Sequence, residues 1–467
     1  MKKILYLSLI FMFFCSYLRA QDTWPHGRII VSDNGHFLKY EDGTPFFWLG
    51  DTGWEMFHRL KMSEIDQYLS NRAEKGFTVI QAVLIAENDG LRTPDKEGQL
   101  PLIDLDPTKP NEKYFRFVDS VVRLARSKGL VMGLLPTWGD KVSKFWGVGP
   151  VIFNEKNAYT YGHWLGERYK DDKNIIWILG GDRPPANDTA DWRPVWRAMG
   201  KGMIDGTGNH ALIAYHPSGW QFTSDYFQNE AWLDVNMMQS GHGSGHDVPV
   251  WEWIIRDWNM VPHKPTLDAE PNYEDHPVSP WPKWNPANGY FRDYDVRKQT
   301  YRSVFAGACG VTYGNHSVWQ FYNPSVQGIN HVERFWYEAL DRPGAVQMGY
   351  LRNLMESRPQ LDRIPDQLII LDGQGEKGEH ICATRDGKGS YLMVYLPVGK
   401  KITINTSSIH SDRIVVSWFN PANGKLRPLG EMDRQDSMSF IPPELGAGND
   451  WVLITDDPLY HYSLVFR

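Results

Sequence analysis

Short apolar segments and helix-like segments alternate along most of this chain, and this alternation limits the fold more than any other feature. Between residues 45 and 316, eight apolar segments are typical of strands, and six of them are followed by a stretch with helical signals. Alternation of this length predicts a parallel sheet with helices outside it, and eight units make a (β/α)8 barrel. A doubly wound open sheet is the alternative, but neither a GxGxxG nor a P-loop motif follows the first strand.

The expected elements can be placed by residue number. A small β-hairpin is expected over 28–48, and a first helix near 63–75, capped by Ser63 with Asp66 three residues on. The strands are expected within 45–54, 76–88, 129–140, 174–182, 211–219, 235–242, 265–272 and 310–316. Further helices are expected near 112–127, 155–170, 190–205, 248–258, 293–307 and 332–357.

The pattern changes near residue 360. Short alternating strands follow, separated by Asp-Gly, Asn-Gly and Gly-Lys turns, and no helix-period run interrupts them. This pattern is typical of a β-sandwich. We therefore divide this α/β chain into a leader, a barrel domain with the N-terminal hairpin, and a C-terminal β-sandwich, at residues 1–20, 21–358 and 359–467.

The first twenty residues resemble a signal peptide, with two lysines, an apolar stretch and a small final residue. We expect cleavage after Ala20 and export, to the periplasm of a Gram-negative bacterium. Cys15 raises the alternative of a surface lipoprotein, but Phe14 stands where a lipobox needs a small residue. No later segment is long and apolar enough to span a bilayer.

Charge and cysteine content narrow the function classes. Removing the leader moves the formal charge from -7 to -10, and an acidic chain without a basic run argues against nucleic-acid binding. Only Cys309 and Cys382 then remain, each in a strand-like segment. Export would permit a disulfide, yet these settings favour two buried free thiols.

Two carboxylates stand where strands end. The apolar run of KNIIWILGGDRP leads through two glycines to Asp182, and PTLDAEPN brings Glu270 to the end of a short strand. Two carboxylates at the carboxyl ends of different parallel strands form the usual machinery of glycoside hydrolysis. If side chains simply alternate along the seventh strand, Asp268 and Thr266 share the pocket face with Glu270.

Each carboxylate also has an ordinary structural interpretation. Asp182 would cap the following loop and pair with Arg183, and Glu270 would form an ion pair with an arginine on the loops of strand eight. His242 and His246 could suggest metal ligands, but the intervening glycines make a loop and no third ligand stands nearby. We therefore predict no metal and no cofactor.

Other polar and aromatic residues end or follow a strand and are candidates for binding sugar hydroxyls and ring faces. The candidate substrate-binding residues are Asp51, Trp54, Gln81, Trp138, Arg183, His216, Gln239, His242, His316 and Trp319. Asp51 is the strongest, because LGDTGW places it between glycines at the expected mouth. The chain has 20 tryptophans, and further ones in loop-like segments are Trp146, Trp220, Trp251, Trp281 and Trp284.

Several motifs agree in order with one known family. FFWLGDTGWEMFHRL, GFTVIQAVLI, WILGGDRP, PTLDAEPNYE and CGVTYGNHSVWQF resemble the apiosidase-like barrel of glycoside hydrolase family 140. The tail resembles the β-domain that accompanies this barrel and carries a collagen-binding label. The resemblance implies a catalytic pair of one Asp and one Glu, here Asp182 and Glu270. The barrel clan usually has Asn-Glu at the end of strand four, where this chain has Gly-Asp.

The resemblance implies a retaining β-apiosidase that cleaves apiofuranosyl linkages in pectin side chains such as rhamnogalacturonan II. Asp182 would be the acid/base and Glu270 the nucleophile. The partner is then a plant cell-wall polysaccharide or oligosaccharide, and Arg183 would either bind a uronate or orient Asp182. The alternatives are a glycosidase with another sugar specificity on the same scaffold, and a non-catalytic carbohydrate- or matrix-binding protein.

Overall fold

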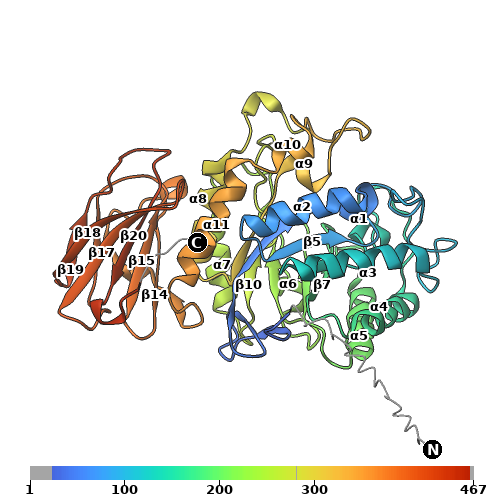
Figure 1. The fold of residues 1–467 in the computed structure, drawn as a ribbon, viewed down its shortest axis with the longest axis horizontal. Helices are drawn as coiled ribbons and strands as arrows, with labels where there is room; N and C mark the ends of the chain where they lie inside the picture. Colours follow the sequence, from blue (N-terminus) through green and yellow to red (C-terminus); the bar gives the residue numbers. More distant parts are fainter. Residues whose placement is uncertain (1–23, 280, 463–467) are drawn as a thin grey trace, which may run out of the picture.

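The structure is a computed structural model that describes residues 24–279 and 281–462, so the leader expected over 1–20 lies outside the described residues. A helix-covered barrel lies beside an all-β domain, with α8 and α11 between them (Figure 1). Within the described ranges, no helix combines the length and apolar character that crossing a membrane requires.

Eight parallel strands form the predicted barrel. They are β4 (Trp48–Thr52), β5 (Val79–Val83), β6 (Val131–Leu135), β7 (Ile175–Gly180), β8 (Ile213–His216), β9 (Asn236–Met238), β10 (Thr266–Asp268) and β11 (Gly310–Tyr313). Six pair in the order β11-β4-β5-β6-β7-β8, and β9 pairs with β10. Backbone hydrogen bonds from Asp234 to Ile213 (2.8 Å) and from Cys309 to Thr266 (2.9 Å) join the two groups and close the barrel.

Side-chain alternation along each strand separates two cores. On β7, Ile176 and Ile178 point into the barrel and belong to its interior cluster. Trp177 and Leu179 point outward and belong to the larger cluster beneath the helices. Both faces of the strand are therefore apolar, which explains why the strand is an uninterrupted apolar run in the sequence.

The N-terminal segment forms a three-stranded antiparallel sheet of β1 (Ile29–Val31), β2 (Leu38–Tyr40) and β3 (Pro45–Phe46). Its buried side chains Ile29, Leu38 and Phe46 belong to the same cluster as the barrel interior. The sheet therefore packs against the end of the barrel where the amino termini of the strands lie.

Helices cover the barrel. They are α1 (Met56–Arg59), α2 (Met62–Glu74), α3 (Glu112–Ser127), α4 (Glu155–Tyr169), α5 (Arg193–Thr207), α6 (Ser224–Phe227), α7 (Val250–Trp258), α8 (Asp293–Phe305), α9 (His316–Trp319), α10 (Trp336–Ala339) and α11 (Pro343–Glu356). Helix α2 begins one residue before Ser63, because the Glu64 carboxylate accepts from the backbone N–H of Lys61 (3.0 Å) and makes Lys61 the cap. The helix expected over 332–357 is two helices, since Pro343 starts a new one.

The C-terminal strands form two antiparallel sheets. The larger has the order β12-β14-β15-β20-β17-β18 and the smaller β13-β16-β19. Their bounds are β12 (Arg363–Pro365), β13 (Ile370–Asp372), β14 (Cys382–Asp386), β15 (Tyr391–Leu396), β16 (Ile402–Asn405), β17 (Arg413–Asn420), β18 (Lys425–Asp433), β19 (Ser437–Phe440) and β20 (Trp451–Asp456). The fold class predicted from the sequence, a barrel followed by a β-sandwich, is confirmed.

The larger β-sheet is apolar on both faces. On β15, Leu392 and Val394 belong to the sandwich core, whereas Met393 and Tyr395 belong to the cluster that continues under the barrel helices. The ring of Tyr395 stacks on Tyr301 of α8 at 4.9 Å. Cys309 and Cys382 are both buried and form no disulfide, which confirms the prediction of two buried free thiols.

We expect exposed polar residues of the β-domain to have no part in turnover. Arg413 on β17 and Glu431 on β18 are half exposed and pair with each other. Both strands lie on the side of the domain away from the barrel (Figure 1). Substituting either by alanine should leave kcat and KM unchanged and hardly move the midpoint of thermal unfolding, because an exposed ion pair contributes little to stability. A large loss of turnover at constant stability would contradict this assignment.

Candidate active site

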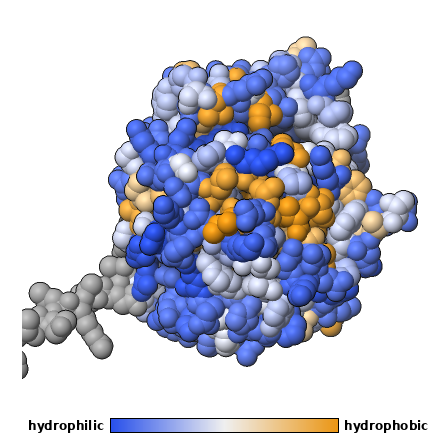
Figure 2. Space-filling view, turned by 90° about the vertical axis from the view of Figure 1, so that its right-hand side faces the viewer, coloured by the Kyte–Doolittle hydropathy of each residue, from blue (hydrophilic) through white to orange (hydrophobic). Residues whose placement is uncertain are grey.

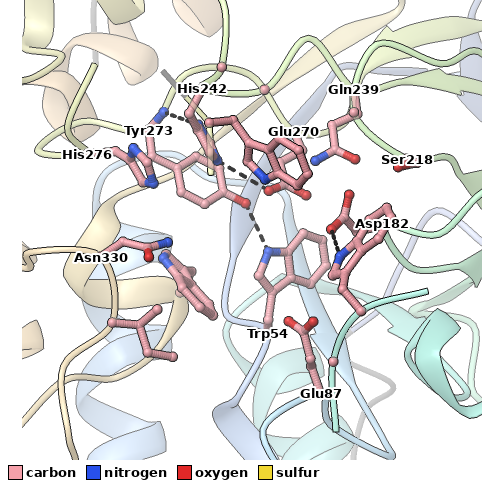
Figure 3. A pocket seen from close by; sticks show the side chains of 18 of the residues that line it. Trp54, Glu87, Asp182, Ser218, Gln239, His242, Glu270, Tyr273, His276 and Asn330 are labelled. Atoms are coloured by element: carbon pink, nitrogen blue, oxygen red, sulfur yellow. Dashed lines mark hydrogen bonds and ion pairs between the residues drawn. The ribbon is translucent and has the colours of Figure 1, made fainter. Parts of the chain in front are cut away.

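Asp182 lies just beyond β7 in a turn that needs its two glycines. Gly180, Gly181 and Asp182 all have positive φ, at 87°, 117° and 49°. A Cβ at Gly180 would lie 2.2 Å from the carbonyl oxygen of His216, so no larger residue fits there. A non-glycine residue in this region stores roughly 1–3 kcal/mol of strain, a feature that concentrates at functional sites. The turn thereby aims the carboxylate of Asp182 into the pocket (Figure 3).

Glu270 lies two residues beyond β10, held by a backbone hydrogen bond from Gly241 to its carbonyl oxygen (2.9 Å). Leu267 and Ala269 belong to the barrel-interior cluster. Asp268 instead turns outward to the hydroxyl of Ser240 (2.5 Å), and Thr266 to Asp257 on α7. The expectation that these two share the face of Glu270 is wrong, because the chain leaves regular strand geometry after Asp268.

Two imidazoles contact the two oxygens of Glu270. Nε2 of His216 lies 3.2 Å from Oε2, and Nε2 of His242 lies 3.4 Å from Oε1. The first pair is close enough for an ion pair, but the two atoms lack the alignment of a hydrogen bond, so this contact is electrostatic. The partners of Glu270 are thus histidines, and not an arginine from the loops of strand eight.

The second nitrogen of each ring fixes its proton. In His242, Nδ1 accepts the backbone N–H of Tyr273 (3.3 Å), so the proton is on Nε2 and points to Glu270. In His216, Nδ1 lies 3.0 Å from the carbonyl oxygen of Pro217, which only accepts, so Nδ1 carries a proton. When His216 is an imidazolium, both rings present an N–H to the carboxylate.

These surroundings give the two carboxyl groups opposite acidities. Burial raises the pKa of Asp182 above its ordinary value; Arg183 opposes the rise, and the negative charge of Glu270 adds to it. Burial also acts to raise the pKa of Glu270, but the close contacts and charges of His216 and His242 outweigh burial and hold that pKa well below its ordinary range. A proton shared between the two acids therefore belongs to Asp182.

Both carboxylates line one pocket of about 800 Å³. Figure 2 looks onto the right-hand side of the view in Figure 1, where loops that follow the barrel strands lie, and hydrophobic residues cluster near the centre of this face. Aromatic side chains dominate the pocket wall: Trp54, Trp138, Trp146, Trp220, Tyr273, Trp281, Trp284 and Trp319. Trp251, which was expected among the sugar-binding tryptophans, does not line the pocket. It stacks on His380 of the β-domain at 4.2 Å.

Five of the ten predicted substrate-binding residues line this pocket: Trp54, Trp138, Gln239, His242 and Trp319. A sixth, His216, lies beneath it against Glu270 and is fully buried. Trp54 donates its N–H to the hydroxyl of Tyr273 (2.9 Å) and lies 5.3 Å from the ring of Trp138. Figure 3 shows the hydroxyl of Tyr273 between the indole of Trp54 and the carboxylate of Glu270.

Asp51 does not reach the pocket. Its side chain is fully buried between the barrel and α2, where Arg72 (2.5 Å) and the hydroxyl of Tyr68 (2.6 Å) bind it. The glycines of LGDTGW therefore do not indicate a mouth residue. They allow close packing instead, since a Cβ at Gly53 would lie 3.0 Å from the hydroxyl of Tyr68.

Gln81 and His316 also lie outside the pocket. Gln81 is inside the barrel, where it donates to the carbonyl oxygen of Ala269 (3.2 Å) and accepts from Thr312 (3.3 Å). His316 is buried behind the wall, where Nδ1 accepts the indole N–H of Trp319 (3.2 Å) and Nε2 contacts the carbonyl oxygen of Asn330 (2.9 Å). His316 thereby supports Trp319 and Asn330, which line the pocket, whereas Gln81 connects β5 to β11 and to the residue before Glu270.

Arg183 does not present a free fork of donors to a uronate. Only 1% of its side chain is exposed. Its donors bind the carbonyl oxygen (2.7 Å) and carboxylate (3.1 Å) of Asp182, Glu87 (2.6 Å) and the carbonyl oxygen of Trp146 (3.1 Å). Of the two roles considered for Arg183, the geometry supports the one that orients Asp182.

The sequence analysis missed several residues that line the pocket: Glu87, Asn88, Ser218, Tyr273, His276 and Asn330. Tyr273 follows Glu270 by three residues, and Glu87 follows the apolar run of β5, so both had a strand-end signal. His242 and His246 do not converge, since His246 pairs with Asp295 of α8 (2.8 Å). In the part of the chain that is described, no group of three or more His, Cys, Asp or Glu side chains is arranged to hold a metal ion.

Comparison with known families places both domains. Residues 32–362 match the family model described as "Apiosidase-like, catalytic domain". Residues 364–456 match the one described as "Putative collagen-binding domain of a collagenase". A search of the curated proteins finds no match.

Solved structures resemble the whole chain. One, described as a glycoside hydrolase, is 35% identical with a TM-score of 0.86, and the match covers 95% of this chain and 100% of the other. Another, described as a glycoside hydrolase family 5 from Bacteroides vulgatus ATCC 8482, is 33% identical with a TM-score of 0.87, covering 95% and 96%.

The placement of Asp51 predicts an effect on stability and not on catalysis. Asp51→Asn leaves the buried charge of Arg72 without its partner, which should lower the free energy of unfolding by roughly 3–5 kcal/mol. The matched control is Asp66→Asn on α2, whose exposed pair with Lys128 (2.7 Å) should contribute less than about 1 kcal/mol. Denaturant unfolding measures both. Unchanged stability with lost activity in Asp51→Asn would contradict the assignment.

Proposed function

This chain belongs to the apiosidase-like family of glycoside hydrolases, and from that premise we propose that it is a retaining glycosidase with Asp182 as acid/base and Glu270 as nucleophile. The observation that carries the proposal is the unequal setting of two carboxyl groups in one aromatic pocket. Asp182, 24% exposed, pairs with Arg183, which also binds Glu87, whereas Glu270 faces two imidazoles. One acid that keeps its proton and one that stays ionised are what double displacement requires.

In the first step, the ionised carboxylate of Glu270 attacks the anomeric carbon and forms a glycosyl ester. The bond to the leaving oxygen breaks as Asp182 gives that oxygen its proton, so the alcohol departs neutral. In the second step, the ionised Asp182 takes a proton from water, the water oxygen attacks the anomeric carbon, and the ester bond to Glu270 breaks. Both carboxyl groups return to their starting states.

The neighbouring residues support these steps. The hydroxyl of Tyr273 accepts the N–H of Trp54 and so keeps its own proton for donation, and burial together with the charge of Glu270 raises its pKa. The N–H of Trp146 binds Asp182 at 3.3 Å. Indole faces along the wall suit the C–H face of a sugar ring.

For the substrate we propose β-linked apiofuranose in pectin side chains such as rhamnogalacturonan II. The support is the family description and the groove of tryptophans around the acid pair. The alternative of another sugar on the same scaffold is carried by the resemblance to a structure described as a family 5 glycoside hydrolase. A purely binding role has less support, because the pocket raises the pKa of one carboxyl group and lowers that of the other, as a glycosidase requires.

For the location we propose export, to the periplasm of a Gram-negative bacterium. The support is the leader-like segment of residues 1–20 and a polysaccharide substrate that lies outside the cell.

Replacing either carboxylate should abolish most turnover without unfolding the protein. On an apioside with a poor leaving group, Asp182→Asn should lower kcat/KM by roughly 10²–10⁴-fold, and Glu270→Gln at least as much. On an aryl apioside whose phenolate departs without protonation, azide should restore turnover only to the acid/base variant, Asp182→Asn, because azide attacks the glycosyl ester without a general base. The matched control is Asp172→Asn, at the amino end of β7, which should keep full activity.

The stereochemistry gives an independent readout. NMR of the first product formed should show the anomeric configuration of the substrate. Inversion, or azide rescue of Glu270→Gln in place of Asp182→Asn, would contradict the assigned roles. Product analysis of a digested pectin side-chain mixture identifies the sugar released, and a sugar other than apiose would replace the proposed substrate.

The proposed steps use carboxyl groups alone, so activity should need no metal ion and no organic cofactor. We expect full turnover after exhaustive dialysis against a chelator. A loss that a divalent cation restores would refute this prediction.

A further inference from the structure

A third carboxylate, Glu87, lies in the pocket and has no part in the steps above. It follows β5 on the loop that leads to α3, its side chain is 25% exposed, and it lines the pocket together with Asp182. Figure 3 shows its carboxylate below the indole of Trp54.

Glu87 and Asp182 share one guanidinium. Arg183 donates one terminal nitrogen to Glu87 (2.6 Å) and the other to the carboxylate of Asp182 (3.1 Å). The bond to Glu87 is the shorter, so the guanidinium pairs more closely with Glu87 than with the carboxylate of Asp182. Arg183 therefore neutralises Asp182 only in part.

Contacts with the loop that carries Trp146 hold Arg183 in place between Glu87 and Asp182. Its Nε binds the carbonyl oxygen of Trp146, and its guanidinium carbon lies 4.3 Å from the centre of the Trp146 ring. A Cβ at Gly147 would lie 2.7 Å from Arg183, so the loop packs directly on the guanidinium. The same indole donates to Asp182, which makes the ring a second link between Arg183 and the acid.

The charged groups around the two carboxyls determine how Asp182 titrates. Burial raises the pKa of Glu87 to about 7, with Arg183 opposing and Asp182 and Asp140 adding to the rise. Asp140 itself is paired with Lys141 (2.7 Å), whose ammonium also lies 3.4 Å from the carbonyl oxygen of Glu87. The charged or titratable groups near Asp182 and Glu87 are thus Asp140, Lys141, Arg183, His216 and Glu270.

We propose that Glu87 is a positioning residue for the acid/base: by binding Arg183, it keeps the guanidinium from pairing fully with Asp182 and so leaves the proton on Asp182. The proposal rests on the acid role of Asp182 proposed above. Glu87 touches no reacting atom in this account and acts through Arg183.

Glu87→Gln tests the idea, because the amide oxygen still accepts from Arg183 while the charge is gone. The full charge of Arg183 should then stabilise ionised Asp182, and the basic limb of the kcat/KM profile should move to lower pH by about one unit. The shift should be seen with a poor leaving group. The dinitrophenolate of a dinitrophenyl apioside departs without protonation. With that substrate, wild type and variant should have the same kcat/KM in the pH range of the basic limb.

Two further variants separate positioning from folding. Glu87→Asp keeps the charge and should restore the wild-type basic limb even where turnover falls. Glu55→Gln removes another buried pocket carboxylate, one bound to His58 (2.8 Å) and Asn88 (2.8 Å), and should leave the limb in place. Thermal unfolding of each variant shows whether a loss of turnover reflects a loss of fold.

An unchanged basic limb in folded Glu87→Gln would overturn the inference, and so would an equal shift in Glu55→Gln. If wild type hydrolyses no apioside, the substrate proposal fails, and the same profiles are then measured on whichever aryl glycoside is cleaved. If Asp182→Asn retains full activity on that glycoside, the acid assignment fails, and the role of Glu87 fails with it.

Discussion

Glu270 remains ionised in a buried pocket because an imidazole lies at each of its two oxygens, and the rest of the site is arranged around this contact. A buried carboxylate is costly to ionise unless donors or positive charge surround it. The backbone of Tyr273 and the carbonyl oxygen of Pro217 fix the protons of His242 and His216. Glu270 in turn disfavours a second negative charge on Asp182. One nucleophile and one acid follow from the same set of contacts.

The barrel supplies these contacts from strands that are distant in sequence. Asp182 follows β7, His216 ends β8, His242 follows β9, and Glu270 follows β10. Because parallel strands bring their carboxyl ends to one face, short loops suffice to bring these side chains together. The strain of the Gly180-Gly181-Asp182 turn is held by packing, since Gly181 exchanges backbone contacts with both His216 and Gly139.

The fold was predictable because its signals are local. Strands that are apolar on both faces, amphipathic helices and turn residues appear in the order that a barrel and a sandwich require. The acids at strand ends were visible for the same reason. Asp51 and His316 lie near strand ends and Gln81 lies within β5, but their roles depend on partners that other segments supply, namely Arg72, Thr312 and Asn330. Asp268 also could not be placed from the sequence. Simple alternation put its side chain on the pocket face with Glu270, but the chain is irregular after β10 and Asp268 points outward.

Arg183 and Glu87 illustrate what only three dimensions reveal. Next to Asp182 in sequence, Arg183 was open to two interpretations, and its burial against Trp146 favours the one in which it orients Asp182. Glu87 is 96 residues from Arg183 and had no local feature to link the two. Electrostatic coupling between such groups depends on distance and burial, and periodicity in the sequence reports neither.

The central claim is that the pocket gives its two carboxyl groups opposite acidities. Carbon-13 NMR of the side-chain carboxyls, titrated with pH and assigned with Asp182→Asn and Glu270→Gln, measures this directly. We predict that the Glu270 signal stays in its ionised position to well below the ordinary range of a glutamate, while the proton lost at higher pH belongs to Asp182. Titration in the reverse order, or of both groups together at their ordinary values, would contradict the account.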